Sequence, residues 1–505
     1  MADLRQNTWI LDEWYAQDVA GEANYAAVDP GKLFVWGKGN SPGASNGILG
    51  LNDNAHRSSP TQVGTDTNWL WVYSAAQIKS DGTLWVSGTQ NGEDGANNQG
   101  NLGLNYNTGH SSPTQVGTDT TWKSVAVSGG MRATKTDGTL WFWGYSSSGT
   151  SGLNQPSSQP SALSSPTQVG TDTNWDWVYG SAAIKSNGTL WMTGCQNGES
   201  GNNNQGNLGQ NDLTSRSSPV QVGTENTWKS VCVTGGTRAT KTDGTLWFWG
   251  YTSNGQSGLN QGSSAPNALS SPTQVGTDTD WDQVFTGGGG HTGCFKTDGS
   301  LYMWGNNTRG QLGLNDVVKR SSPTQVAGTW KSSVCSSSYA VTNCARSDGT
   351  IWSWGDNEYG ELGHNSTNAG TSSPTQIASG VTTWKSLTTG SAATLAIKTD
   401  GTMWSWGTNS NGKGMVDPAQ RTSSPTQIGT DSTWNYVNSG GDWSMASKTD
   451  GTIWMAGIQE FGQLGNNVGG TTQNLSSPIQ LPGTDWVVRN CFGGNGLTPK
   501  AKKAD

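Results

Sequence analysis

The stretch Asp137-Gly-Thr-Leu-Trp-Phe-Trp-Gly144 decides the fold, because close variants of it occur nine times in the 505 residues. An alternating β-rich sequence leads into it from Ala133. Asp-Gly is a favoured two-residue hairpin turn, in which both central residues take positive φ. We therefore predict a hairpin with Trp141 and Trp143 on one face of its second strand. The turn glycine precedes the final glycine by six residues in all nine copies, which fixes the register.

Two further strings complete each unit. Ser-Ser-Pro recurs nine times with its prolines 51 or 53 residues apart, and a lone Trp such as Trp122 follows each copy. Proline is tolerated at the start of a strand, so we predict a third strand over Thr114–Val116 and a fourth over Trp122–Val127. Four short strands in every ~50 residues, with no helical period, are typical of β-propeller blades. The fold class is therefore all-β.

The number of units predicts the domain organisation. Nine units are followed by one extra Trp strand, since Trp14 and Trp486 occupy the same place at the two ends of the chain. We predict one nine-bladed ring over residues 14–490; the alternative is a seven-bladed ring with two extra repeats. The extra strand would complete the last blade from the opposite terminus or cap it independently. Residues 1–13 are then a docking lead, and 491–505 a flexible tail that contains lysines.

Composition excludes several classes of protein. The net charge is −8 with only 28 Lys and Arg, which argues against nucleic-acid binding. No apolar run is long enough to span a membrane, and the first residues lack the apolar segment of a secretory signal. Only 13% of residues are charged, so the surface is neutral and polar. The six cysteines are too few for a disulfide framework and are interpreted as small buried hydrophobes.

The repeats resemble the regulator-of-chromosome-condensation (RCC1) family. The resemblance rests on units such as Leu301-Tyr-Met-Trp-Gly-Asn-Asn-Thr-Arg-Gly-Gln-Leu-Gly-Leu-Asn315, followed by Ser321-Ser-Pro-Thr-Gln-Val326, and covers roughly residues 14–490. It implies a propeller, with seven blades in the family, and roles such as nucleotide exchange on a small GTPase. The chain departs from the exchange factor, because its tail has only three lysines and no unit carries an outsized insertion. It also lacks the Gly-Trp-Arg-His-Thr motif of the family's ultraviolet photoreceptor.

Catalytic and metal-binding patterns are weak. The four histidines fall in different units, so none has a repeated partner. His291 and Cys294 follow a glycine run but do not make four zinc ligands. The acidic pairs Glu93-Asp94 and Glu358 with Glu361 are interpreted as solvated loops, although calcium at the first pair is an alternative. We predict no enzyme activity, no cofactor and no metal.

The connections that follow the motif glycine differ between units. They run 22 to 25 residues to the next Ser-Ser-Pro proline in units two to five, but 18 or 19 in units six to eight. A block of 106 residues is duplicated within the longer set. Loops rich in Tyr, Asn and Gln resemble adaptable binding surfaces, although soluble connectors are the alternative. The candidate ligand-binding residues are Tyr145, Asn154 and Gln155 in one copy, and Tyr251, Asn260 and Gln261 in the other.

These observations favour a non-enzymatic interaction propeller. The leading hypothesis is a bacteriophage virion component, a tail, fibre or surface protein that contacts host surface glycan or a neighbouring virion protein and is assembled in the host cytoplasm. The alternative is a soluble, cytoplasmic regulator, either an exchange factor for a small GTPase or an inhibitor-type propeller. Exposed aromatic side chains would favour a protein partner, whereas grooves of Asn and Gln would favour glycan.

Overall fold

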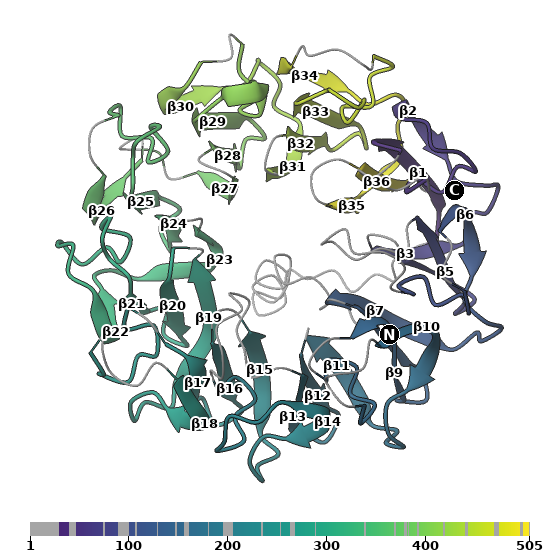
Figure 1. Cartoon of the computed structure of the whole chain (residues 1–505). Helices are drawn as coiled ribbons and strands as arrows, with labels where there is room; N and C mark the ends of the chain where they lie inside the picture. The colour runs from purple at the N-terminus through teal and green to yellow at the C-terminus, as the bar shows by residue number, and fades with distance from the viewer. Residues whose placement is uncertain are drawn as a thin grey trace.

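Nine four-stranded antiparallel sheets form a ring (Figure 1). The ring closes between its last and first sheets, because the indole N–H of Trp36 donates to the backbone oxygen of Gln463 at 2.8 Å. The nine-bladed prediction is therefore confirmed. The computed structural model describes residues 30–503 apart from 40–46, 74–75, 89–99, 107–108, 129, 147–148, 156–160, 180, 195–205, 234–235, 253, 263–267, 288, 338–339, 368–369, 378–380, 382, 391–392, 418–419, 440–442, 469–473 and 495–497.

We number the blades by their third strand in chain order. Blade 1 contains β35 (Trp486–Gly494), β36 (Thr498–Lys503), β1 (Lys32–Gly37) and β2 (Arg57–Gln62). Blade 2 contains β3 (Trp69–Tyr73), β4 (Ala76–Lys79), β5 (Leu84–Gly88) and β6 (His110–Gln115). Blade 3 contains β7 (Trp122–Ser128), β8 (Gly130–Lys135), β9 (Leu140–Ser146) and β10 (Ser161–Gln168).

The next three blades follow the same order. Blade 4 contains β11 (Trp175–Tyr179), β12 (Ala182–Lys185), β13 (Leu190–Gly194) and β14 (Arg216–Gln221). Blade 5 contains β15 (Trp228–Val233), β16 (Thr237–Lys241), β17 (Leu246–Tyr251) and β18 (Ala268–Gln274). Blade 6 contains β19 (Trp281–Gly287), β20 (His291–Lys296), β21 (Leu301–Gly305) and β22 (Arg320–Val326).

The last three blades complete the ring. Blade 7 contains β23 (Trp330–Ser337), β24 (Val341–Arg346), β25 (Ile351–Gly355) and β26 (Thr371–Gln376). Blade 8 contains β27 (Trp384–Thr389), β28 (Ala393–Lys398), β29 (Met403–Gly407) and β30 (Thr422–Gln427), with a single 3₁₀ turn, η1 (Ser410–Gly412), before β30. Blade 9 contains β31 (Trp434–Ser439), β32 (Trp443–Lys448), β33 (Ile453–Gly457) and β34 (Leu475–Gln480).

The Trp strand is the innermost strand of each blade rather than the last strand of the sequence unit. Trp122 pairs with Lys135 of the hairpin that follows it, so β7 begins blade 3 (Figure 1). The Ser-Ser-Pro strand lies at the outer edge, where its proline costs no ladder bond. Structural blades are thus shifted by one strand from the units in the sequence.

Blade 1 combines the two ends of the chain. Strand β36 pairs with β1 on one side and with β35 on the other. The predicted strand from the opposite terminus therefore exists and begins at Trp486, whose ring lies 6.2 Å from that of Trp36. The tail was expected to be free from residue 491, but Thr498–Lys503 are an internal strand. The predicted lead and Trp14 lie outside the described residues.

The Asp-Gly turns differ from the predicted two-residue type. Gly138 has φ of 79°, but Asp137 is not among the residues with positive φ. The loop has three residues, because the N–H of Lys135 donates to Thr139 O and that of Gly138 to Lys135 O. The Asp137 carboxylate accepts both the N–H and the hydroxyl of Thr139, at 3.0 and 2.7 Å, and this network holds the longer loop. A Cβ on Gly138 would lie 2.0 Å from the backbone oxygen of Thr173.

Stacked tryptophans and a buried lysine form the core of a typical blade. In blade 3 the rings of Trp122 and Trp141 meet edge to face at 5.9 Å. The ammonium of Lys135 lies 3.7 Å from the centre of the Trp141 ring and 2.9 Å from the carboxylate of Asp119. The indole N–H of Trp141 donates to Thr139, which links the core to the turn. The repeated Trp and Asp-Gly-Thr residues thus have a structural role in the core of the blade.

The cysteines differ in part from the interpretation as buried hydrophobes. Cys294 is free and buried, and Cys232 is free and half-buried. Cys335 and Cys344 instead form a disulfide between β23 and β24, where they are directly opposed with Cα atoms 4.1 Å apart. The other two cysteines, Cys195 and Cys491, have no described side chains. Sequence spacing gives no signal for such a pair, because cross-strand register decides it.

Candidate binding surface

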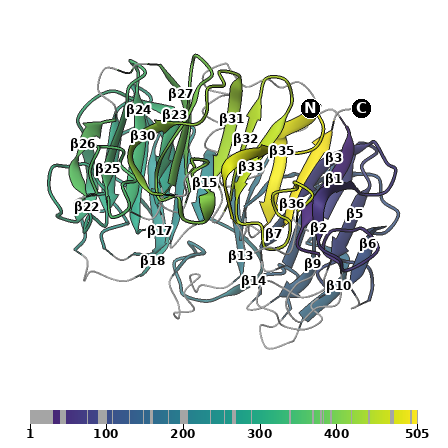
Figure 2. The ribbon, with the colours of Figure 1, turned by 90° about the horizontal axis from the view of Figure 1, so that it is seen from above.

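One face of the ring carries all the connections between third and fourth strands. Every blade has the same strand order, so its third strand always ends at this face (Figure 2). The Asp-Gly turns lie on the opposite face. We call the residues between the end of each third strand and the start of the following fourth strand the connection face. Much of the long connections, including 89–99 and 195–205, lies outside the described residues.

The two predicted tyrosines lie where a third strand meets the connection face. Tyr145 is near the end of β9 and 37% exposed, whereas Tyr251 ends β17 and is half-buried. Their backbone N–H groups donate to the side-chain oxygens of Asn101 and Asn207, at 3.0 and 2.9 Å. Both rings therefore start from backbone that is fixed by the preceding blade's connection.

The two predicted asparagines have a structural role that the sequence did not reveal. Asn154 and Asn260 have positive φ, and their backbone N–H groups donate to Ser217 and Ser321 of the next blade. The same bond recurs at 2.5 to 2.8 Å from Asn52, Asn105, Asn211, Asn315, Asn365 and Asn467.

The side chains of these asparagines divide into two groups. In the six other copies the asparagine Oδ1 also accepts a hydroxyl proton from a serine of the next blade, for example Ser165 to Asn105 at 3.0 Å. Asn154 and Asn260 make no such bond among the described residues, and both are exposed. Their backbones are therefore structural, whereas their side chains are exposed.

The predicted glutamines are half-buried. The side-chain oxygens of Gln155 and Gln261 are enclosed and have no hydrogen-bond partner among the described residues. Each follows its asparagine directly, so the structure keeps each predicted set within one connection. It does not bring the two sets together, because blade 4 lies between blades 3 and 5.

Exposed apolar side chains on this face were missed by the sequence analysis. Every large hydrophobic side chain that is exposed in the described part of the chain lies in a third-to-fourth connection or at its start. Val317 and Val318 are the most open, at 60% and 59%. Five of the seven lie one to three residues after an asparagine whose N–H donates to the next blade, a position that is visible in the sequence. The set is Tyr106, Tyr145, Leu213, Val317, Val318, Tyr359 and Val468.

The weaker chemical candidates lie in the core. His291 is buried in β20, where loss of solvation lowers its pKa to about 4, and burial raises the pKa of the Cys294 thiol. The interpretation of Glu361 as solvated was wrong: it is 4% exposed, it accepts the N–H of Tyr359, and burial raises its pKa. No cluster of three metal-ligating side chains occurs in the described ranges. The calcium candidate at Glu93 lies outside them.

Comparison with known proteins agrees with this architecture. The family model "Regulator of chromosome condensation (RCC1) repeat" matches residues 298–342 and 348–397, and a second model of the repeat matches 384–413. This part of the chain therefore matches RCC1 repeats. The ultraviolet-B receptor UVR8 of Arabidopsis thaliana is 32% identical to this RCC1-repeat propeller over 124 residues, which are 24% of this chain and 28% of that receptor. The match therefore spans little more than a quarter of that relative.

Two solved structures match the chain at low sequence identity. Yeast RCC1 (Prp20), solved with Kap60 bound, has a TM-score of 0.49 at 16% identity and covers 95% of this chain and 90% of that chain. Human WBSCR16 has a TM-score of 0.47 at 17% identity and covers 72% and 99%. No helix in the described residues is long and apolar enough to cross a bilayer.

Proposed function

We propose that this RCC1-repeat propeller is a non-enzymatic binding protein that takes a protein partner on its connection face. The observation that supports this is that the large hydrophobic side chains exposed in the described residues all lie on that face, with Val317 and Val318 adjacent in one connection. Apolar patches within a polar surface are typical of protein-protein contacts. A glycan surface would be expected to present Asn and Gln instead.

The test is affinity purification of the full chain from its source cells, with quantitative mass spectrometry. The double variant Val317→Ser/Val318→Ser removes the most exposed apolar side chains of the connection face. Thr118→Ser, an exposed position on the opposite face, is the matched control. A partner held by wild type and control but reduced at least ten-fold by the double variant supports the proposal. Equal recovery with all three proteins contradicts it.

The finer proposal is that the partner is a neighbouring protein in a bacteriophage virion. Its support is the neutral polar composition and the near-identical duplicated block. Mass spectrometry of density-purified particles, beside the soluble lysate, tests it: stoichiometric enrichment in the particle band is expected. Absence from particles with a soluble partner would favour the regulator alternative.

Host surface glycan is the other ligand to test. A glycan array compares wild type with Tyr145→Ala/Tyr251→Ala. Signals that are present in wild type and lost in the variant would assign the tyrosines to a glycan site. Equal signals would remove them from it.

A further inference from the structure

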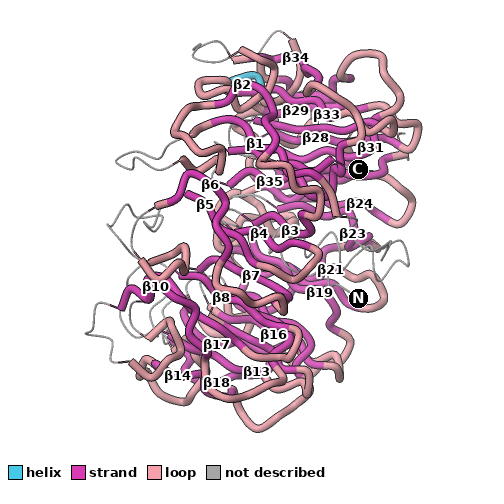
Figure 3. The backbone as a smooth tube through the Cα atoms, turned by 90° about the vertical axis from the view of Figure 1, so that its right-hand side faces the viewer, coloured by secondary structure: helices cyan, strands magenta, loops and turns pink. Residues whose placement is uncertain are grey.

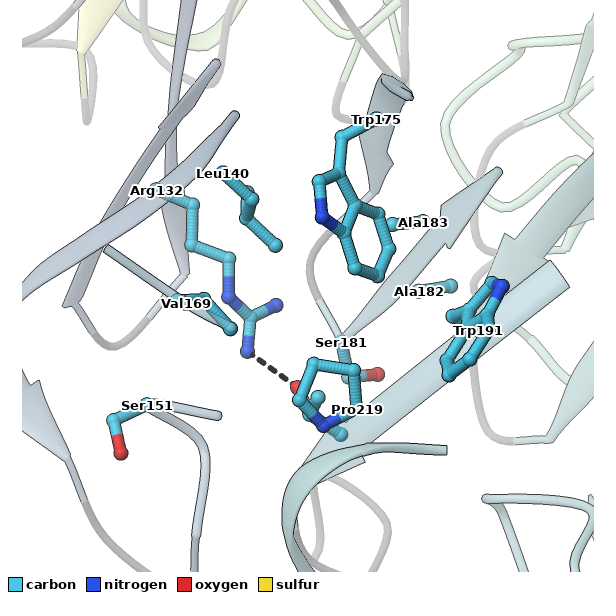
Figure 4. A pocket seen from close by; sticks show the side chains of 11 residues that line it. Arg132, Leu140, Ser151, Val169, Trp175, Ser181, Ala182, Ala183, Trp191 and Pro219 are labelled. Atoms are coloured by element: carbon cyan, nitrogen blue, oxygen red, sulfur yellow. Dashed lines mark hydrogen bonds between the residues drawn. The ribbon is translucent and has the colours of Figure 1, made fainter. Parts of the chain in front are cut away.

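A cavity between blades 3 and 4 contains a buried arginine that forms no ion pair with any residue that the structure describes. Arg132 extends from β8 toward Ser181 and Pro219 of the next blade (Figure 4). The cavity volume is about 10 Å³, which is room for roughly one water-sized particle. Its lining contains hydroxyl and apolar side chains but no acidic residue.

The guanidinium of Arg132 donates two hydrogen bonds within the described part of the chain. The residue is 6% exposed, and one terminal nitrogen donates to the backbone oxygen of Thr150 and to the hydroxyl of Thr193, the latter at 2.9 Å. No ion pair to it occurs among the described residues. Loss of solvation lowers its pKa to about 10, so it remains charged at neutral pH. A buried charge of this kind is costly unless something neutralises it.

The cavity exists because a tryptophan is missing. In six blades the residue before the motif glycine is a Trp whose indole N–H donates to the preceding blade, as Trp304 does to Gln256 O at 3.0 Å. Blade 4 has Thr193 at this position, and Arg132 takes the acceptor, Thr150 O, that the indole would use. Arg238 donates to the equivalent acceptor, Gln256 O, alongside the Trp304 indole, so the cavity beside Arg132 corresponds to the absent indole.

We propose that this cavity binds one monovalent, halide-sized anion against Arg132. The positive charge of Arg132, the neighbouring hydroxyl of Thr193 and the small cavity suit a small monovalent anion such as chloride or bromide, whereas phosphate and carboxylate ligands are too large. The ion would neutralise Arg132 and join blades 3 and 4. The site would therefore be a structural anion site that stabilises the junction between the two blades.

Arg238 provides a matched control within the same chain. It is the copy of Arg132 in the duplicated block and is 2% exposed, but the next blade supplies Trp304. The indole fills the space that is open beside Arg132. Replacing Arg238 therefore alters a buried arginine without removing the proposed site.

The experiment uses bromide as probe on the full chain. Thermal unfolding is measured in sodium bromide and in sodium gluconate at equal ionic strength, and crystals grown in bromide are examined at the bromine absorption edge. We expect a saturating rise in Tm of about 2 °C in bromide, and an anomalous peak beside Arg132. Both should be lost in Arg132→Met and Thr193→Trp, and kept in Arg238→Met. Thr193→Trp keeps the charge but fills the cavity, as Trp304 does beside Arg238.

Three outcomes would overturn the proposal. Density for water without an anomalous signal means that the cavity holds only solvent. A peak with no bromide-dependent Tm means an adventitious ion only. The same bromide effect in wild type and all three variants means a general salt effect.

Discussion

Blades 3 and 5 contain the same sequence from Arg132 and Arg238 to the end of the hairpin, yet their arginines have different surroundings. Beside Arg238 the neighbouring blade places Trp304, and beside Arg132 it places Thr193. One junction is filled by an indole, and the other contains a cavity beside a charge. Identical repeats therefore become different sites, because each junction is made by two blades.

Size complementarity across junctions supports this conclusion. The residue that corresponds to Arg132 is Ala76 in blade 2 and Ala182 in blade 4. These alanines lie in the same hydrophobic clusters as Trp143 and Trp249 of the following blades. A small residue thus accompanies a Trp at these two junctions, whereas at the blade 5–6 junction Arg238 and Trp304 share the acceptor Gln256 O. A change in one blade is best understood together with its neighbour.

Of the substitutions considered, the one that opens the blade 5–6 junction should cause the largest loss of stability. Trp304→Thr makes the blade 5–6 junction resemble the blade 3–4 junction. Trp304 is 1% exposed, so we expect a loss of about 3–5 kcal/mol in stability from the cavity and the lost apolar contacts. Urea unfolding followed by fluorescence measures it. If Arg238 then acts like Arg132, the variant also gains a bromide-dependent Tm.

The control for this change is Trp304→Phe, which keeps an aromatic ring and should lose less than half as much stability. A loss below 1 kcal/mol for Trp304→Thr would contradict the packing role assigned to the indole. It would also weaken the comparison, because the two junctions would then be energetically alike.

The sequence predicted the blades well and the junctions poorly. The spacing of Asp-Gly, Trp and Ser-Ser-Pro depends on local turns and alternation, which a single unit displays. The pairing of Arg132 with Thr193 depends on residues from two blades, and nothing in one unit marks it. The disulfide between Cys335 and Cys344 was missed for a similar reason, because strand register brings the two residues together.

On the candidate binding surface, too, the sequence predicted some features and missed others. Tyr145 and Asn154 could be singled out because the duplication repeats them. The exposed Val317 and Val318 follow Asn315, whose backbone N–H bonds to the next blade. Their exposure depends on the path of the connection outside the blade, which the sequence does not show. Asn154 also has a backbone role in the next blade, which an exposed polar loop does not indicate.

Acid should destabilise blade 6, which contains His291, more than blade 4. Burial lowers the pKa of His291 to about 4, below its ordinary value near 6.5, so the fold favours neutral imidazole. This stability is complete above about pH 6.5 and is lost as the pH falls toward 4, by about 3 kcal/mol. Hydrogen exchange at pH 7 and pH 4.5 should show β20 and β21 losing protection before β12 and β13.

His291→Gln should remove the part of the acid effect that lies between pH 6.5 and 4.5, whereas His56→Gln, at an exposed position, should not. Equal protection loss in blades 4 and 6 at pH 4.5 would show that His291 does not set the order. The carboxylates held by turn hydroxyls, such as Asp137, have lowered pKa values and contribute only at lower pH.

The smallest expected effect concerns the asparagines that join neighbouring blades. Asn105→Gly keeps the positive φ accessible and removes the acceptor of the Ser165 hydroxyl, so we expect a loss of about 1 kcal/mol. Asn154→Gly removes a side chain that makes no such bond among the described residues, and should change stability by less than about 0.5 kcal/mol. Paired urea titrations can resolve the difference. Equal losses would mean that the Asn154 amide is also structural, and would remove it from the proposed binding surface.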